Sequence, residues 1–90
     1  MQADKEKVCR LLKTARGQID GVLRMIEEDR YCIEISRQVM AAEAVLRRAN
    51  SEILQAHLAG CVKSAFESGS EEEKDEKIRE VMDILEKLSK

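Results

Sequence analysis

One histidine and two cysteines stand at spacings that suit a shared metal ion. His57 and Cys61 are four residues apart, and residues four apart on a helix lie on the same face, so an imidazole and a thiol can bind one ion between them. The pair alone is weak support, because a cysteine beside apolar residues such as Leu58 is more often packed as a small hydrophobic side chain. Cys32, which follows Tyr31, adds a second sulfur.

Two thiolates and one imidazole form a soft set of donors. Such a set suits Cu(I), which accepts few ligands, and it does not suit Mg²⁺, Ca²⁺ or Mn²⁺, which prefer oxygen. Zn²⁺ is the main competing ion, but a structural zinc site normally has four protein ligands and the pattern supplies three. Catalysis fits poorly, because the chain has one histidine, no Gly-rich phosphate loop and no Ser/His/Asp pattern. The pattern therefore predicts a metal-binding protein that is not an enzyme.

The elements that position these residues are expected to be helices. The 90 residues include no proline or tryptophan, one Phe and one Tyr, while 38% are charged, a composition poor in strand formers. Apolar residues recur every three or four positions in residues 4–28, which predicts a first helix that breaks near 28–31. A long helix is expected from Cys32 or Ile33 to about Phe66, and a third helix up to about Ser89. The expected fold class is all-α, with a single domain over residues 1–90.

The boundary between the last two helices carries its own signals. Gly69 suits the end of the long helix, and Ser70-Glu71-Glu72-Glu73 matches the capping box that starts a helix. Within the first helix, Gly17 and Gly21 each cost about 1 kcal/mol relative to Ala. We therefore expect a close backbone approach at these two glycines.

The apolar positions of the predicted helices form stripes. They are Val8, Leu11, Leu12, Ala15, Ile19, Val22, Leu23 and Ile26 in the first helix, Ile35, Val39, Ala42, Leu46, Ala49, Ile53, Ala56 and Gly60 in the long helix, and Ile78, Val81, Met82, Leu85 and Leu88 in the third. The stripe of the long helix advances alternately by four and three residues. This is the pattern of a helix that packs along a partner helix.

A continuous long helix keeps Cys32 and Cys61 of one chain apart. Their 29-residue separation corresponds to about 43 Å at 1.5 Å per residue. A second copy can bring them together: in an antiparallel pair with a two-fold axis near Leu46 or Arg47, residue n faces roughly residue 93 − n. Cys32 would then lie opposite Cys61 of the partner subunit and near His57 of the partner subunit, which gives two equivalent sites in a homodimer.

The distribution of charge and the number of cysteines limit where this protein can act and what it can bind. The net charge is −2, but residues 1–25 carry six basic and three acidic side chains, whereas residues 67–90 carry five basic and nine acidic ones, so a basic face is expected at one end only. No stretch approaches the ~20 apolar residues of a membrane span, and the N-terminus lacks the apolar region of a signal peptide. Three cysteines are an odd number, which argues against a disulfide framework. A cytoplasmic protein is expected.

Three segments together resemble the copper-sensitive operon repressor (CsoR) family of bacterial metal- and stress-sensing repressors. They are Arg16-Gly17-Gln18-Ile19-Asp20-Gly21, Arg24-Met25-Ile26-Glu27-Glu28-Asp29-Arg30-Tyr31-Cys32, and His57-Leu58 with Cys61-Val62. The resemblance covers nearly the whole chain. It implies a three-helix protomer that assembles as a dimer of dimers, that is, a homotetramer. Together with the antiparallel pairing inferred above, this leads us to expect a dimer with a four-helix bundle core. The resemblance also implies binding to operator DNA without a helix-turn-helix, and release from DNA when Cu(I) binds.

The resemblance further assigns roles to single residues. It implies that Cys32, His57 and Cys61 are the Cu(I) ligands and that Tyr31 and Glu80 support them. Persulfide-sensing members of the family lack the histidine, while formaldehyde- and nickel/cobalt-sensing members lack the second cysteine, so the residues of this chain favour copper. A persulfide- or thiol-responsive repressor using Cys32 and Cys61 is the alternative, and a helical scaffold without a ligand is a third hypothesis.

Contacts to DNA are expected from exposed basic side chains. The candidates are Arg10, Lys13, Arg16, Arg47 and Arg48, and the resemblance favours Arg16 and Arg48. Family members commonly carry an Arg where this chain has Leu11, and Arg10 lies about 100° away from that position around the helix. Cys9 matches no ligand of the family and is expected to pack among its apolar neighbours.

Overall fold

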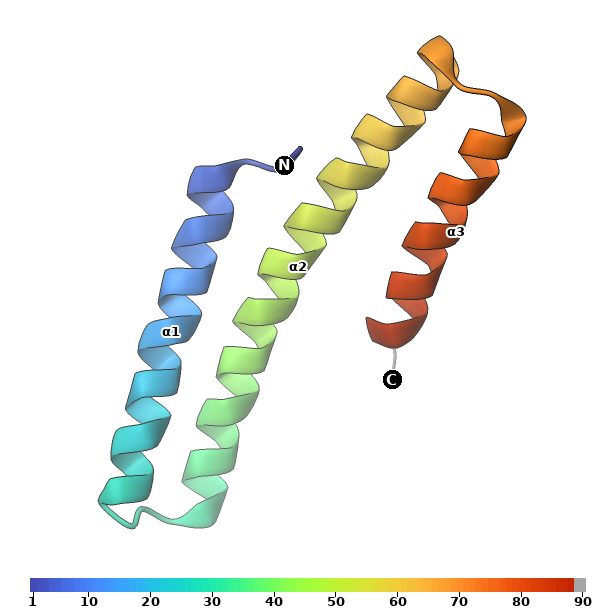
Figure 1. Cartoon of the computed structure of the whole chain (residues 1–90). Helices are drawn as coiled ribbons and strands as arrows, with labels where there is room; N and C mark the ends of the chain where they lie inside the picture. The colour runs from blue at the N-terminus through green and yellow to red at the C-terminus, as the bar shows by residue number, and fades with distance from the viewer. Residues whose placement is uncertain (89–90) are drawn as a thin grey trace.

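The computed structural model is built from α-helices, and residues 1–88 contain no strand (Figure 1). Helix α1 spans Lys5–Glu27, α2 spans Cys32–Ser68 and α3 spans Glu71–Leu88. The structure describes residues 1–88, except the side chains of residues 61, 62, 65, 66, 68 and 88. The predicted all-α, three-helix fold is therefore confirmed.

The three helices lie side by side in a single layer, with α1 and α3 flanking α2 (Figure 1). The chain measures 57 × 28 × 12 Å, and its smallest dimension is about the diameter of one helix. The radius of gyration is 17.7 Å, whereas a compact domain of this length has about 12 Å. Buried side chains in the described part are small: Ala3, Val8, Ala15, Ala42, Ala49 and Val81. The protomer therefore has almost no core of its own.

Helix α1 begins and ends within one residue of its predicted bounds. The side chain of Asp4 accepts hydrogen bonds from the N–H groups of Glu6 and Lys7, at 3.0 and 3.3 Å, as a helix N-cap residue should. At the other end, Asp29 adopts a left-handed conformation with φ 54°, which Asp tolerates better than most non-glycine residues. This residue reverses the chain between α1 and α2, within the predicted break.

Helix α2 runs without interruption, as predicted, and extends two residues beyond the expected end. Only part of its apolar stripe is buried within the protomer, and the rest stays exposed. Ala42 and Ala49 are buried within the protomer, on the rows next to Glu52, whose carboxylate lies 3.0 Å from the ammonium of Lys7 in α1. Val39 and Leu46 of the same stripe stay 40% and 41% exposed, because they lie further around the helix from α1.

Helix α3 starts at the predicted cap. The hydroxyl of Ser70 accepts a hydrogen bond from the Glu73 N–H at 3.2 Å, which is one half of the capping box. Gly69 follows the last residue of α2, as expected, without a positive φ. Of the apolar face predicted for α3, only Val81 is buried, while Ile78, Met82 and Leu85 are exposed; the side chain of Leu88 lies outside the description.

The two glycines of α1 are not explained by packing inside the protomer. A Cβ added at Gly17 would meet no atom within 4 Å, and one at Gly21 would meet only the Arg24 guanidinium at 4.0 Å. The close approach predicted for these positions therefore has no counterpart within the chain.

The free space at Gly17 leads to a stability prediction. We expect Gly17→Ala to raise the free energy of unfolding by about 0.5–1 kcal/mol, because Ala has the higher helix propensity and nothing in the protomer opposes it. Urea unfolding at one fixed protomer concentration measures the effect, since association changes apparent stability. A loss of stability would mean that a second copy uses the space at Gly17.

Candidate metal and DNA sites

Two of the candidate ligands, Cys32 and His57, lie on the face of α2 that the protomer leaves uncovered. Residues seven apart on a helix differ by only about 20° in direction, and the row Cys32, Val39, Leu46 and Ile53 advances in steps of seven. His57 follows Ile53 by four residues and so continues this row. Cys32 and His57 are exposed. The sulfur, the imidazole and the exposed apolar side chains therefore share one face, which we call the uncovered face.

A single chain does not assemble the predicted site. Cys32 is the first residue of α2, and His57 follows 25 residues later, which places it about 38 Å along the helix axis. Among the described residues, no group of three or more His, Cys, Asp and Glu could hold a metal ion. The backbone of Cys61 lies in α2, but its side chain is outside the described residues. The rise of α2 thus separates the ligands as the sequence predicted.

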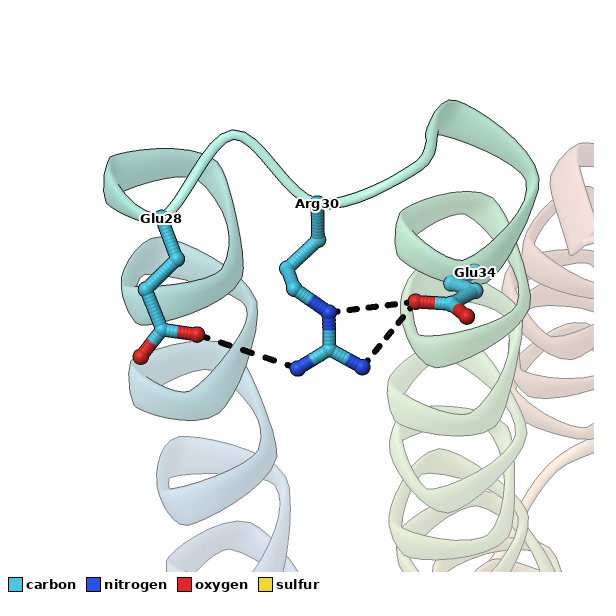
Figure 2. A network of polar contacts seen from close by, with 3 residues as sticks. All are labelled: Glu28, Arg30 and Glu34. Atoms are coloured by element: carbon cyan, nitrogen blue, oxygen red, sulfur yellow. Dashed lines mark hydrogen bonds and ion pairs between the residues drawn. The ribbon is translucent and has the colours of Figure 1, made fainter.

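The segment before Cys32 is held by a charged network (Figure 2). The Arg30 guanidinium donates through Nε and Nη2 to one carboxylate oxygen of Glu34, at 3.2 and 3.0 Å, and its Nη1 lies 3.7 Å from the carboxylate of Glu28. We call this network the Arg30 bracket. Sequence reasoning missed it, although the alternation of Glu28, Arg30 and Glu34 around the predicted break was a usable signal.

The predicted supporting residues lie at different ends of the protomer. Tyr31 is exposed and precedes α2, and its carbonyl oxygen accepts the Ile35 N–H at 3.2 Å. Glu80 is exposed on α3, with its carboxylate 3.8 Å from the ammonium of Lys77. A hydrogen bond from His57 to Glu80 stays a prediction.

The five candidate DNA contacts are all exposed, but the two helices present them in several directions. Arg10 and Lys13 line a surface hollow of about 450 Å³ together with Lys5, Glu6 and Cys9. Arg47 and Arg48 are neighbours on α2 and point about 100° apart, and the Arg47 guanidinium lies 3.9 Å from the Glu43 carboxylate. Arg16 is a further 60° around α1 from Lys13.

Two observations modify the expectations for α1. Cys9 is exposed, so the prediction that it packs among apolar residues is wrong; it follows the buried Val8 and is therefore turned about 100° away from the packed row. Arg24, which sequence reasoning did not select, lines a second hollow of about 550 Å³ together with Gly17, Gly21 and Arg30. Both hollows open beside basic side chains.

Comparison with known proteins places the chain in a family. Residues 4–87 match the family model described as "Metal-sensitive transcriptional repressor". The chain belongs to this family. The family is one of transcriptional repressors, a role that is not enzymatic. Among the described residues, no helix is long and apolar enough to cross a membrane.

Similar proteins carry names of copper sensors. The chain is 39% identical over 69 residues to the copper-sensing transcriptional repressor CsoR of Mycobacterium tuberculosis (strain ATCC 25618 / H37Rv), covering 77% of this chain and 58% of that protein. It is 33% identical over 87 residues to the copper-sensing transcriptional repressor CsoR of Bacillus subtilis (strain 168), covering 97% of this chain and 83% of that protein. The matched region thus spans little more than half of the mycobacterial relatives.

Two solved structures share the fold. The copper-sensing repressor CsoR with Cu(I) from Geobacillus thermodenitrificans NG80-2 matches with a TM-score of 0.81 and 35% identity, covering 100% of this chain and 94% of that chain. The nickel-responsive transcriptional regulator InrS matches with a TM-score of 0.83 and 31% identity, covering 92% and 93%. These two regulators are named for different metals, so the fold alone does not select the metal.

The expectation that the metal site is shared between subunits can be tested by mixing two variants. Cys32→Ala and Cys61→Ala proteins should each lose the complete site, whereas a mixed dimer should regain about one site, because one of its two ends keeps both cysteines. Cu(I) titration before and after subunit exchange measures this recovery. No recovery after exchange that mass spectrometry has verified would contradict a shared site.

Proposed function

We propose that this protein is a Cu(I)-responsive transcriptional repressor that binds operator DNA in the metal-free state and releases it when Cu(I) binds. It acts in the cytoplasm as a homo-oligomer, an antiparallel dimer with a four-helix bundle core that pairs into a dimer of dimers. Residues 1–90 form one domain that carries both the metal site and the DNA-binding surface.

The observation that carries this proposal is the position of the candidate ligands on the uncovered face. A layer one helix thick leaves Val39 and Leu46 exposed, and burying them against a second copy removes apolar surface from water. The same packing brings Cys32 of one protomer toward His57 of the partner subunit and Cys61 of the partner subunit. Association and site formation are therefore one event.

The donors that would meet there suit copper. Cys32, His57 and Cys61 supply two soft sulfurs and one imidazole, a set that favours Cu(I) over the oxygen-preferring ions. Cys32 and His57 are both exposed in the protomer, so an entering ion can reach them. When bound, Cu(I) would join side chains from two subunits. The names of several relatives and of one solved neighbour support copper as the ion.

The DNA-binding surface is proposed to include basic residues of α1 and α2. Arg10, Lys13, Arg16, Arg47 and Arg48 are exposed and can reach phosphates, which contribute most of the salt-dependent affinity for DNA. Membership in a family of transcriptional repressors supports DNA as the partner. The acidic α3, whose first turn contains Glu71, Glu72 and Glu73, is a poor surface for phosphate and is excluded from the proposed interface.

Metal and DNA binding are proposed to be linked through helix packing. The coupling free energy is reciprocal, so Cu(I) weakens DNA binding by the same factor by which DNA weakens Cu(I) binding. Tyr31 and Glu80 are proposed as partners of the ligands, since groups that hydrogen-bond a ligating imidazole fix its orientation. A bond from His57 to Glu80 would connect the metal to α3.

The direct test measures affinity for duplex DNA from the cognate promoter under reducing conditions. We expect tight binding without metal, at least tenfold weaker binding with one equivalent of Cu(I) per protomer, and little change with Ni²⁺ or Zn²⁺. Equal affinity with and without Cu(I) would refute the proposal. Release of DNA by Ni²⁺ and not by Cu(I) would instead indicate a nickel-responsive repressor, as the second solved neighbour is named.

Salt dependence tests the electrostatic part of the interface. For the metal-free protein, log K should fall steeply with log salt, by about 0.9 for each counterion released. Arg16→Ala and Arg48→Ala should flatten this slope, by about one unit for each phosphate that the variant no longer binds. Arg79→Ala removes the same charge from the acidic α3 and serves as the control. A wild-type slope near zero would contradict phosphate binding by these residues.

His57 separates copper sensing from persulfide sensing. His57→Ala leaves both cysteines, so we expect measurable Cu(I) binding but a loss of about 1–3 kcal/mol in coupling to DNA, because the imidazole no longer transmits metal binding. DNA affinity with and without saturating Cu(I), at one salt concentration, measures the coupling. Gln55→Ala, a change at an exposed residue of the same helix, is the control.

The opposite result would change the assignment. If His57→Ala protein still releases DNA with Cu(I) to the wild-type extent, His57 is not the allosteric ligand. If a persulfide donor releases DNA from both the His57→Ala protein and the wild-type protein, the thiol-responsive alternative through Cys32 and Cys61 replaces copper sensing.

A further inference from the structure

We propose that Arg30 is a positioning residue for Cys32, and that the Arg30 bracket holds the first turn of α2 where a shared metal site needs it. This inference rests on the proposed metal-binding function and names a residue that does not itself touch the metal. It concerns the preparation of the site in the metal-free protein.

The bracket connects the end of α1 to the start of α2. The backbone N–H of Arg30 donates to the Met25 carbonyl at 3.0 Å, which ties Arg30 to the last turns of α1. Its guanidinium lies between the carboxylate of Glu28, the C-cap of α1, and that of Glu34, the third residue of α2. In the chain, Cys32 lies between Arg30 and Glu34, the two residues that these hydrogen bonds join (Figure 2).

The start of α2 depends on this interaction because it does not begin with a standard cap. Tyr31 precedes the helix, and tyrosine is not one of the short side chains that cap helices. A Glu at the position of Glu34 often returns its carboxylate to the backbone at the helix start, but here the carboxylate accepts two hydrogen bonds from Arg30. The guanidinium has no acceptor and cannot cap the N–H groups of this turn; it instead joins the Glu34 side chain to the segment that follows α1.

At the start of α2, the Arg30 bracket matters more for the position of Cys32 than for the stability of the fold. The side chains of Arg30, Glu28 and Glu34 are about half exposed or more, and ion pairs of that kind contribute little to the stability of the whole fold. A metal site, by contrast, requires its ligands within about 0.5 Å of the bonding geometry. Cys32 must meet ligands of another subunit, so an undefined first turn would lower metal affinity while the helices remain folded.

The test compares Arg30→Ala with Arg37→Ala, which removes the same charge from an exposed position of α2. In the metal-free protein, Arg30→Ala should accelerate amide hydrogen exchange at Ile35, whose N–H donates to Tyr31 at the first turn. In a Cu(I) competition titration, it should weaken the affinity about 3- to 10-fold with unchanged stoichiometry, below the 10- to 100-fold typical of groups that bond a ligand directly. Arg37→Ala should change neither quantity.

A double-mutant cycle asks whether Arg30 acts through Glu34. Glu34→Gln alone should reproduce most of the loss in Cu(I) affinity, and the double variant should lose little more, because both changes remove the same interaction. Arg30→Lys should restore only part of the affinity, since an ammonium lacks the planar fork that reaches both carboxylates. The urea unfolding midpoint should stay at the wild-type value in all of these variants.

Several outcomes would overturn the inference. Unchanged amide exchange at Ile35 and unchanged Cu(I) affinity in Arg30→Ala would do so, and so would an equal loss of affinity in Arg37→Ala, which would reduce the effect to net charge. If wild-type protein binds no Cu(I), the proposed function fails instead. Amide exchange needs no metal, and it would still decide whether the Arg30 bracket holds the Cys32 turn.

Discussion

The thickness of the protomer is the constraint from which the other properties follow. A layer 12 Å thick places each helix against one or two neighbours and leaves its remaining faces in water. Small side chains such as Ala42 and Ala49 let α1 approach α2 closely, but their burial removes little apolar surface. Larger side chains, including Leu46 and Met82, are exposed. The chain therefore has little core of its own, which supports the proposal that it associates and that its metal site is shared between subunits.

The continuity of α2 gives this association a consequence for metal binding. A helix of 37 residues is a rigid spacer of about 55 Å, so it separates Cys32 from His57 by a length that one chain cannot close. An ion held by both must join two chains. In the proposed dimer, metal binding would therefore change how the two subunits are held together, and this change would reach the DNA-binding surface.

The turn between α1 and α2 shows how a weak interaction can serve such a site. Exposed ion pairs add little to folding, yet the Arg30 bracket lies beside the first candidate ligand and joins the ends of two helices. The two solved neighbours named for copper and nickel share this fold, so the fold alone does not select the metal. In our proposal the donor type selects the ion, and the turn before Cys32 positions one of the donors.

The sequence by itself determined the three helices, the uninterrupted α2 and the separation of Cys32 from Cys61 along it. These features depend on local periodicity, on glycine and proline placement and on the fixed rise of a helix, all of which can be read from neighbouring residues. Only the tertiary structure decided that α1 buries Ala42 and Ala49, that Cys9 is exposed, and that Arg30 joins Glu28 to Glu34. Those outcomes depend on the rotation of each helix about its own axis relative to its neighbour and on the left-handed conformation of Asp29. A helical period encodes neither of these.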